Sequence, residues 1–226
     1  HKEGTVGNYL ASMTFEYNQT WAFSIDGSYP WCGNGISAQP GVYSSFDETD
    51  IRRKSLMVGQ QYNMATGAPL SCQKDGTPLN YTEEIEPYEK APQAAGARLN
   101  KYAWKTDDIW ERDNDWVLMR YAEILLMRAE ANFRLGFDGN ALLLVNQLRG
   151  RALVAPLAAV TEEDLDKEWL HEFVFEGLRR TVNIRFGTYF QPWWNKDATP
   201  TYKGVFPIPQ SVLDKNPNLK QNPDYL

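Results

Sequence analysis

The stretch that decides the fold is RYAEILLMRAEANFRLG, residues 120–136. Its apolar residues recur at spacings of three and four, which is the pattern of a helix with one buried face. We predict a helix over residues 115–135, stopped by Gly136, because glycine readily takes the left-handed conformation that ends a helix. The residues expected to face the core are Leu118, Ala122, Leu125, Ala129 and Phe133.

A second helix is predicted directly after this one. Asp138 can cap it, and the helical pattern continues to about Ala152. The connection between the two helices is short, so they are expected to pack as an antiparallel hairpin. The inward residues of the second helix are Ala141, Leu144, Val145 and Leu148.

A third helix is predicted after Thr161, which lies three residues before Asp164 in a capping-box arrangement. We expect it to continue to about Phe186 and to end before Gly187. Its inward residues are Leu165, Trp169, Phe173 and Gly177. The prolines after Gly187 exclude a further long helix, so an irregular tail is expected.

The charged residues of the first helix admit a catalytic or a structural interpretation. Glu123 and Glu130 are seven residues apart, about 10 Å along a helix axis, which is near the separation of the two carboxylates in inverting glycosidases. However, Arg120 lies three residues from Glu123, and Arg134 lies four residues from Glu130. Neighbouring guanidinium groups lower a carboxylate pKa, whereas a general acid needs a raised one. The pattern therefore favours structural pairing, and we assign no catalytic residue.

No other pattern indicates an enzyme or a metal site. His171 has no second histidine four residues away, so the third helix is not a zinc-binding HExxH helix. The acidic segment 107–116 lacks the glycine and the distal glutamate of an EF-hand, so a solvated turn is favoured over a calcium site. Cys32 and Cys72 can form a disulfide or remain unpaired. We expect no metal and no cofactor.

Charge and hydropathy exclude two further classes. The net charge is −6, and no block of Lys and Arg occurs, which argues against a nucleic-acid partner. No apolar run approaches the ~20 residues that a membrane-spanning helix needs.

Residues 1–110 differ in amino-acid composition from the helical remainder of the chain. They are rich in Gly, Pro, Asn and Ser, and they hold eight of the twelve tyrosines and four of the eight tryptophans. Aromatic rings in loops can stack on the flat faces of sugars, or they can pack the loops onto a scaffold. As candidate carbohydrate-binding residues we select Trp21, Tyr29, Trp31, Asn34 and Tyr43.

Four segments together resemble the SusD/RagB family, which comprises surface lipoproteins of glycan and peptide uptake in the Bacteroidetes. RYAEILLMRAEA (120–131) and VNQLRGRA (145–152) are similar to its helical hairpin. EFVFEGLRRTVNIRFG (172–187) is similar to its Phe-Glu-Gly-x-Arg helix, and VFPIPQSVLDKNPNLKQNPDYL (205–226) to its terminal signature. The chain departs from the pattern at Val182, Asn183 and Asp224, and the first two put one internal ion pair of the family in doubt.

The resemblance implies a mainly α fold of tetratricopeptide-like helical hairpins with long, irregular, aromatic-rich loops. It further implies a single C-terminal domain over residues 1–226. From the change in composition we expect 1–110 to form the loop-rich ligand-binding part and 111–226 the helical scaffold and Pro-rich tail. The early repeats and the lipid-bearing cysteine of such a protein would precede His1.

The function implied by the resemblance is non-catalytic binding of a glycan at the cell surface. The glycan would be delivered to a SusC-like TonB-dependent transporter at the outer membrane, where a lipid anchor outside this chain holds the protein. The alternative is a helical-repeat adaptor that binds a protein or peptide in the same kind of uptake system.

Overall fold

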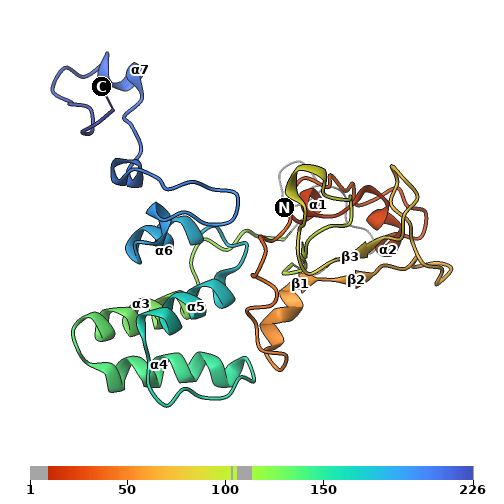
Figure 1. Cartoon of the computed structure of the whole chain (residues 1–226), viewed down its shortest axis with the longest axis horizontal. Helices are drawn as coiled ribbons and strands as arrows, with labels where there is room; N and C mark the ends of the chain where they lie inside the picture. The colour runs from red at the N-terminus through yellow and green to blue at the C-terminus, as the bar shows by residue number, and fades with distance from the viewer. Residues whose placement is uncertain (1–9, 103, 106–113, 226) are drawn as a thin grey trace. The chain divides into compact units, whose positions relative to one another are not determined.

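The computed structural model describes residues 10–102, 104–105 and 114–225 (Figure 1). They belong to two compact units, His1–Glu176 and Gly177–Leu226. Helix predominates over strand in the described residues, which confirms the mainly α expectation. The single-domain organisation over 1–226 stays a prediction.

The loop-rich part of the first unit contains only short elements. Its α-helices are α1 (Leu10–Thr14) and α2 (Thr20–Phe23). Strand β1 (Leu56–Met57) pairs antiparallel with β4 (Arg98–Leu99), and β2 (Gly59–Gln60) pairs antiparallel with β3 (Asn80–Tyr81). The 3₁₀ helices here are η1 (Tyr17–Gln19), η2 (Ile51–Ser55) and η3 (Tyr88–Lys90). Strands of two residues contribute few ladder hydrogen bonds, so side-chain interactions must hold these loops.

Arg98 is the main polar anchor of the loops. Its buried guanidinium donates hydrogen bonds to the carbonyls of Thr14, Ile36, Gln93 and Ala95 at 2.7–3.1 Å. One side chain thus joins segments that are far apart in the sequence and satisfies carbonyls that no sheet pairs.

An apolar cluster lies beneath these loops. Its buried members are Phe15, Cys32, Cys72, Leu79, Tyr81, Ala94 and Leu99. Both cysteines are free thiols, so of the two alternatives the structure has the unpaired one. Burial, aided by the charge of Glu16, raises the pKa of Cys32 to about 12, which keeps this thiol protonated.

The helical part of the first unit consists of α3 (Tyr121–Arg134), α4 (Asp138–Arg151) and α5 (Glu162–Phe173). Figure 1 shows α3 and α4 as an antiparallel hairpin, with α5 packed against α3. The buried apolar residues shared among these helices include Ala122, Leu125, Ala129, Ala141, Val145, Leu148, Leu165 and Trp169. The predicted inward faces of the hairpin are largely confirmed.

The beginning of the first predicted helix is wrong. Helix α3 starts at Tyr121, and Arg120 precedes it in an extended conformation with φ −142° and ψ 161°. Leu118 is therefore not on a helix face and is 87% exposed. Asp138 is the first residue of α4, not its cap, because Phe137 occupies the N-cap position.

The third predicted helix begins correctly but ends too late. Thr161 and Asp164 form the expected capping box. Helix α5 stops at Phe173, and α6 (Arg179–Arg185) is separate. Between them Phe175 (φ 62°) and Gly177 (φ 82°) adopt left-handed conformations, which interrupt a right-handed helix. Gly177 consequently lies in the break and not on a helix face, whereas Gly187 (φ 74°) follows α6 as predicted.

The second unit combines α6 with short turns and an extended tail. It contains η4 (Thr188–Phe190), η5 (Thr201–Gly204) and α7 (Gln210–Leu213). The guanidinium of Arg180 lies 5.0 Å from the ring centre of Tyr189 and 4.2 Å from that of Phe206, a cation–π arrangement. In neither unit does the described chain include a helix with the length and apolar character needed to cross a membrane.

Candidate functional site

Charged residues of the helices take part in a buried network of ion pairs. Arg120 donates to the carboxylate of Glu172 at 2.5 Å and to that of Glu176 at 2.8 Å. The predicted pairing of Arg120 with Glu123 is therefore wrong, because the extended backbone at Arg120 directs its side chain to the end of α5. The predicted i,i+4 pair of Glu130 with Arg134 is confirmed at 3.0 Å.

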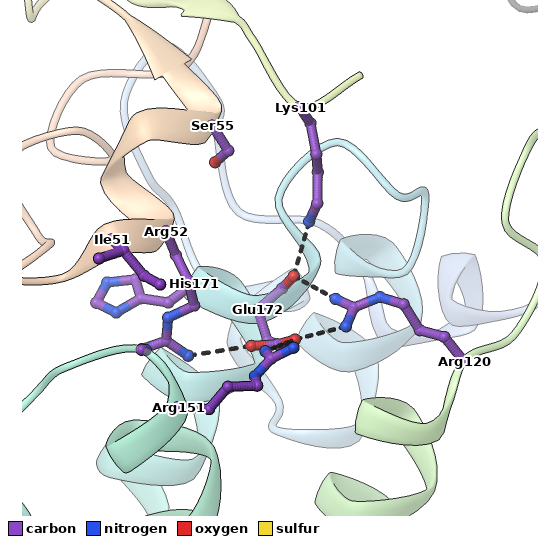
Figure 2. Close-up of a pocket in the computed structure, with 9 residues that line it drawn as sticks. Ile51, Arg52, Ser55, Lys101, Arg120, Arg151, His171 and Glu172 are labelled. Carbon is purple, nitrogen blue, oxygen red and sulfur yellow. Dashed lines mark hydrogen bonds and ion pairs between the residues drawn. The ribbon is translucent and has the colours of Figure 1, made fainter. Parts of the chain in front are cut away.

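Glu172 is the centre of this network (Figure 2). One carboxylate oxygen accepts from Arg120 and Arg151, and the other pairs with Arg52 at 3.3 Å. Burial would raise the pKa of Glu172, but Arg120 and Arg151 outweigh that effect and lower the pKa to about 2. Glu172 is thus charged at neutral pH, and its carboxylate connects the segments that carry these arginines.

The network joins the loops to the helices. Arg52 in η2 pairs with Asp50 and with Glu168 of α5, both at 2.8 Å. Glu168 also pairs with Arg149 of α4 at 2.7 Å. Because each of these carboxylates is almost fully buried, their pairing positions the elements against one another.

The geometry opposes a glycosidase. Glu123 and Glu130 are each only 6% exposed, and Glu130 accepts a hydrogen bond from the indole nitrogen of Trp169 at 3.0 Å. Carboxylates enclosed in this way cannot reach a polysaccharide. Both side chains therefore belong to the scaffold.

His171 is a packing residue. Its ring stacks on Phe46 with 3.9 Å between ring centres, and Nε2 lies 3.0 Å from the hydroxyl of Ser45. Burial, reinforced by the charge of Arg52, lowers the pKa of His171 to about 3, so the ring is neutral at physiological pH. Within the described ranges no three His, Cys, Asp or Glu side chains cluster as metal ligands would. Asp107, Asp108 and Asp113 lie outside those ranges.

Two of the candidate aromatic rings are partly exposed, and each packs against a glycine. Trp21 in α2 is 37% exposed, and a Cβ atom at Gly27 would lie 2.4 Å from its ring. Trp31 is 49% exposed, and a Cβ atom at Gly33 would lie 2.7 Å from its ring. Each indole thus lies directly against a glycine backbone and still presents surface to solvent.

The other aromatic candidates differ from these two. Tyr29 is exposed to the same extent as Trp31 and precedes Pro30. Tyr43 is half-buried, packs against the cluster of Phe46 and Leu56, and lies under Arg53 with 4.3 Å from the guanidinium carbon to the ring centre. Tyr43 lines its own depression of about 640 Å³, so the structure does not bring it to Asn34.

Asn34 lines the largest depression described in this part of the chain, of about 730 Å³. Asn34 takes a left-handed conformation (φ 48°), and its amide oxygen is buried without a hydrogen-bond partner in the described structure. None of the four selected rings lines this depression; the aromatic ring there is that of Tyr17. The other polar side chains that line it are those of Ser37, Gln73, Lys74, Gln93 and Arg98.

Sequence reasoning missed Tyr17, Gln73 and Gln93. Tyr17 lies in the same loop-rich part and is exposed to the same extent as Trp21, but no local pattern distinguishes it from the other tyrosines. The two glutamines come from distant segments, which only the fold brings together. The depression combines amide groups and one aromatic ring with the cationic side chains of Lys74 and Arg98, so it can form hydrogen bonds with a hydroxyl-rich ligand.

Comparison with known proteins places the chain in a family. Residues 6–203 match the model of the SusD family. The chain is 40% identical over 123 residues to the starch-binding protein SusD of Bacteroides thetaiotaomicron, an alignment that covers 50% of this chain and 22% of that protein. It is 29% identical over 152 residues to the SusD-like protein P38 of Formosa agariphila, covering 59% of this chain and 29% of that protein.

Solved structures show the same fold. The surface glycan-binding protein A of Bacteroides uniformis superposes with a TM-score of 0.60 at 24% identity, over 96% of this chain and 47% of that one. A SusD-like protein of Bacteroides fragilis superposes with a TM-score of 0.65 at 18% identity, over 95% of this chain and 51% of that one. The chain therefore spans about half the length of these two structures. With 198 of its 226 residues inside the family match, the chain belongs to the SusD family, whose members are non-catalytic binding proteins.

Proposed function

We propose that this chain binds a glycan without catalysis at the cell surface, through the loops of its first 45 residues. The observation that carries the proposal is the pair of exposed indoles, Trp21 and Trp31, each lying against a glycine. Two similar proteins are named for starch binding and for surface glycan binding, which supports a saccharide as the ligand class.

The physical case rests on the exposure of these rings. A half-exposed indole leaves apolar surface in water, and stacking on the C–H face of a sugar removes that surface. Gly27 and Gly33 allow the backbone to approach each ring closely, which fixes the ring without covering its outer side. A ring held in advance loses little conformational entropy on binding.

The proposed contacts are Trp21, Tyr29, Trp31 and Asn34, with Tyr17 as an addition from the structure. The depression at Asn34 is also lined by Gln73 and Gln93, whose amide groups can form hydrogen bonds with sugar hydroxyls. Tyr43 is left out, because Arg53 and the neighbouring core occupy its surroundings.

The wider role follows from family membership. In the proposal, the glycan passes to a SusC-like TonB-dependent transporter at the outer membrane, where a lipid anchor attaches the protein. The α3–α4 hairpin would be one tetratricopeptide-like repeat of the scaffold.

The test is binding to a panel of neutral polysaccharides, with starch first, measured by isothermal titration calorimetry. Trp31→Ala should weaken binding by ~1–3 kcal/mol, as expected for an aromatic anchor, and leave the melting temperature nearly unchanged. Gly33→Ala should weaken binding similarly, because the added methyl group displaces the ring.

The matched control is Gly150→Ala, since a Cβ atom at Gly150 meets no atom within 4 Å. It should leave affinity unchanged. Unchanged affinity in Trp31→Ala together with a large loss of thermal stability would identify Trp31 as a packing residue. Binding of a peptide but of no polysaccharide would favour the adaptor alternative.

A further inference from the structure

A third cavity lies beside Glu172 (Figure 2). Its volume is about 280 Å³, enough for a small ion or one sugar ring. Four basic side chains line it against one carboxylate: Arg52, Lys101, Arg120 and Arg151 against Glu172. The single negative charge of Glu172 does not balance the four positive charges around the cavity.

The surrounding network carries an excess of positive charge. Among the residues that the structure describes, the ion pairs of this network join five cations to four carboxylates. The cations are the four that line the cavity and Arg149. The carboxylates are those of Asp50, Glu168, Glu172 and Glu176. His171 also lines the cavity, but it is neutral at physiological pH and adds no charge.

Arg151 is the cation whose positive charge the carboxylates of the network neutralise least. Lys101 and Arg120 direct their nitrogens to Glu176 and to the backbone carbonyl of Glu172. By contrast, the ion pair described for Arg151 is with Glu172, which it shares with two other arginines. The side chain of Arg151 is 57% exposed, so guanidinium N–H groups remain available at the mouth of the cavity.

Ser55 supplies an independent indication of a ligand. Ser55 lines the same cavity, and its hydroxyl oxygen is buried without a hydrogen-bond partner in the part of the chain that the structure describes. A buried hydroxyl without a partner is costly, and a polar ligand in the cavity would satisfy it.

We propose that this cavity binds an oxyanion, a carboxylate, sulfate or phosphate group, with Arg151 as the charged contact and Ser55 as a hydroxyl donor. Lys101, Arg52 and Arg120 contribute to the positive field around the cavity. The group can come from a free inorganic ion or from an acidic sugar, and the cavity has room for either. This site is independent of the proposed aromatic one.

The experiment is a titration of the protein with inorganic phosphate and sulfate at pH 7, followed by calorimetry and thermal denaturation. Ionic strength is held constant with sodium chloride, because screening by itself changes the stability of charged proteins. The expected result is saturable binding and a rise in melting temperature. Arg151→Gln should weaken phosphate binding by about tenfold or more, since it removes a charge-assisted contact.

Ser55→Ala is the second variant. It should weaken binding severalfold without lowering the melting temperature of the ligand-free protein, because its hydroxyl has no partner to lose. It keeps the proposal testable if Arg151→Gln does not fold. Arg134→Gln is the matched control, since Arg134 is also a half-exposed arginine paired with a buried glutamate, and it should bind phosphate normally.

Glucuronic acid and glucose distinguish the two sources. Tighter binding of glucuronic acid than of phosphate would identify an acidic sugar as the ligand, and the reverse order a free ion. Equal binding of glucose and glucuronic acid would overturn the proposal. So would a phosphate effect that equals that of sodium chloride, or that persists unchanged in both cavity variants. Trp31→Ala should leave phosphate binding unchanged, which separates this site from the glycan site.

Discussion

At the scale of single residues, the charged side chains of the helices form buried ion pairs that connect different elements of the fold. One carboxylate, Glu172, meets guanidinium groups from η2, from α4 and from the residue before α3. Breaking a buried pair by removal of one partner costs more than the pair contributes, because the remaining charges stay buried and unpaired.

Glu172→Gln should lower the free energy of unfolding by ~3–5 kcal/mol at pH 7, since three arginines lose their shared anion. The folded-state pKa of Glu172 is about 2, below the ordinary value of 4.5. Its contribution is therefore complete above pH 4.5 and is lost as the pH falls toward 2, because the unfolded chain binds the proton first. Urea denaturation between pH 2 and pH 7 should show a shallower decline with acid in the variant.

Glu163→Gln provides the control for this series, because Glu163 is an exposed residue on the same helix. It should stay within ~0.5 kcal/mol of the unmodified protein at pH 7. An acid dependence in Glu172→Gln identical to that of the unmodified protein would show that other groups carry it.

At the scale of elements, local signals located helix ends where a capping side chain or a left-handed glycine marks them, as Gly136 and Gly187 do. Thr161 and Asp164 satisfy each other's backbone N–H groups at 3.1 and 2.9 Å, so the start of α5 was predictable. The end of α5 was not, because no proline marks it and Phe175 takes a left-handed conformation that disfavours a large side chain. Phe175 instead packs against both apolar clusters of the loops.

Thr161→Ala should lower the free energy of unfolding by ~1 kcal/mol, within the usual range of ~0.5–2 kcal/mol for a lost N-cap. Thr161→Ser keeps the hydroxyl that accepts from the Asp164 N–H and should be nearly neutral. Urea denaturation followed by circular dichroism compares the two. Equal losses in both variants would assign the effect to the threonine methyl group and not to the cap.

At the scale of the whole molecule, the first unit depends on contacts between its loops and its helices. Arg52 pairs with two carboxylates of α5, and the N–H of Ile51 donates to the carbonyl of Ala152 at 3.1 Å. Strands of two residues contribute little stability of their own, so the loops rely on this attachment. The first unit is therefore expected to unfold as one cooperative body.

Arg52→Met should remove this coupling. In the unmodified protein, tryptophan fluorescence and far-ultraviolet circular dichroism should give coincident transitions of the first unit, because coincidence of probes is a test of two-state unfolding. In Arg52→Met the two transitions should no longer coincide, because tryptophan fluorescence reports on both the loops and the helices, whereas circular dichroism reports mainly on helix. Arg128→Met, at an exposed position of α3, should keep the transitions coincident. Coincident and unshifted transitions in Arg52→Met would contradict the expected coupling.

The helical hairpin, its buried face and the capping box were predictable from the sequence, because they depend on spacings of three to seven residues over which periodicity and capping act locally. The family was predictable from four motifs between residues 120 and 226. The tertiary structure alone decided the partners of the arginines, because Arg120 and Glu172 are 52 residues apart and Arg52 and Glu172 are 120 apart. It also decided that Trp21 and Trp31 stay exposed while Tyr43 is half-buried, since burial depends on which distant segments pack around a ring.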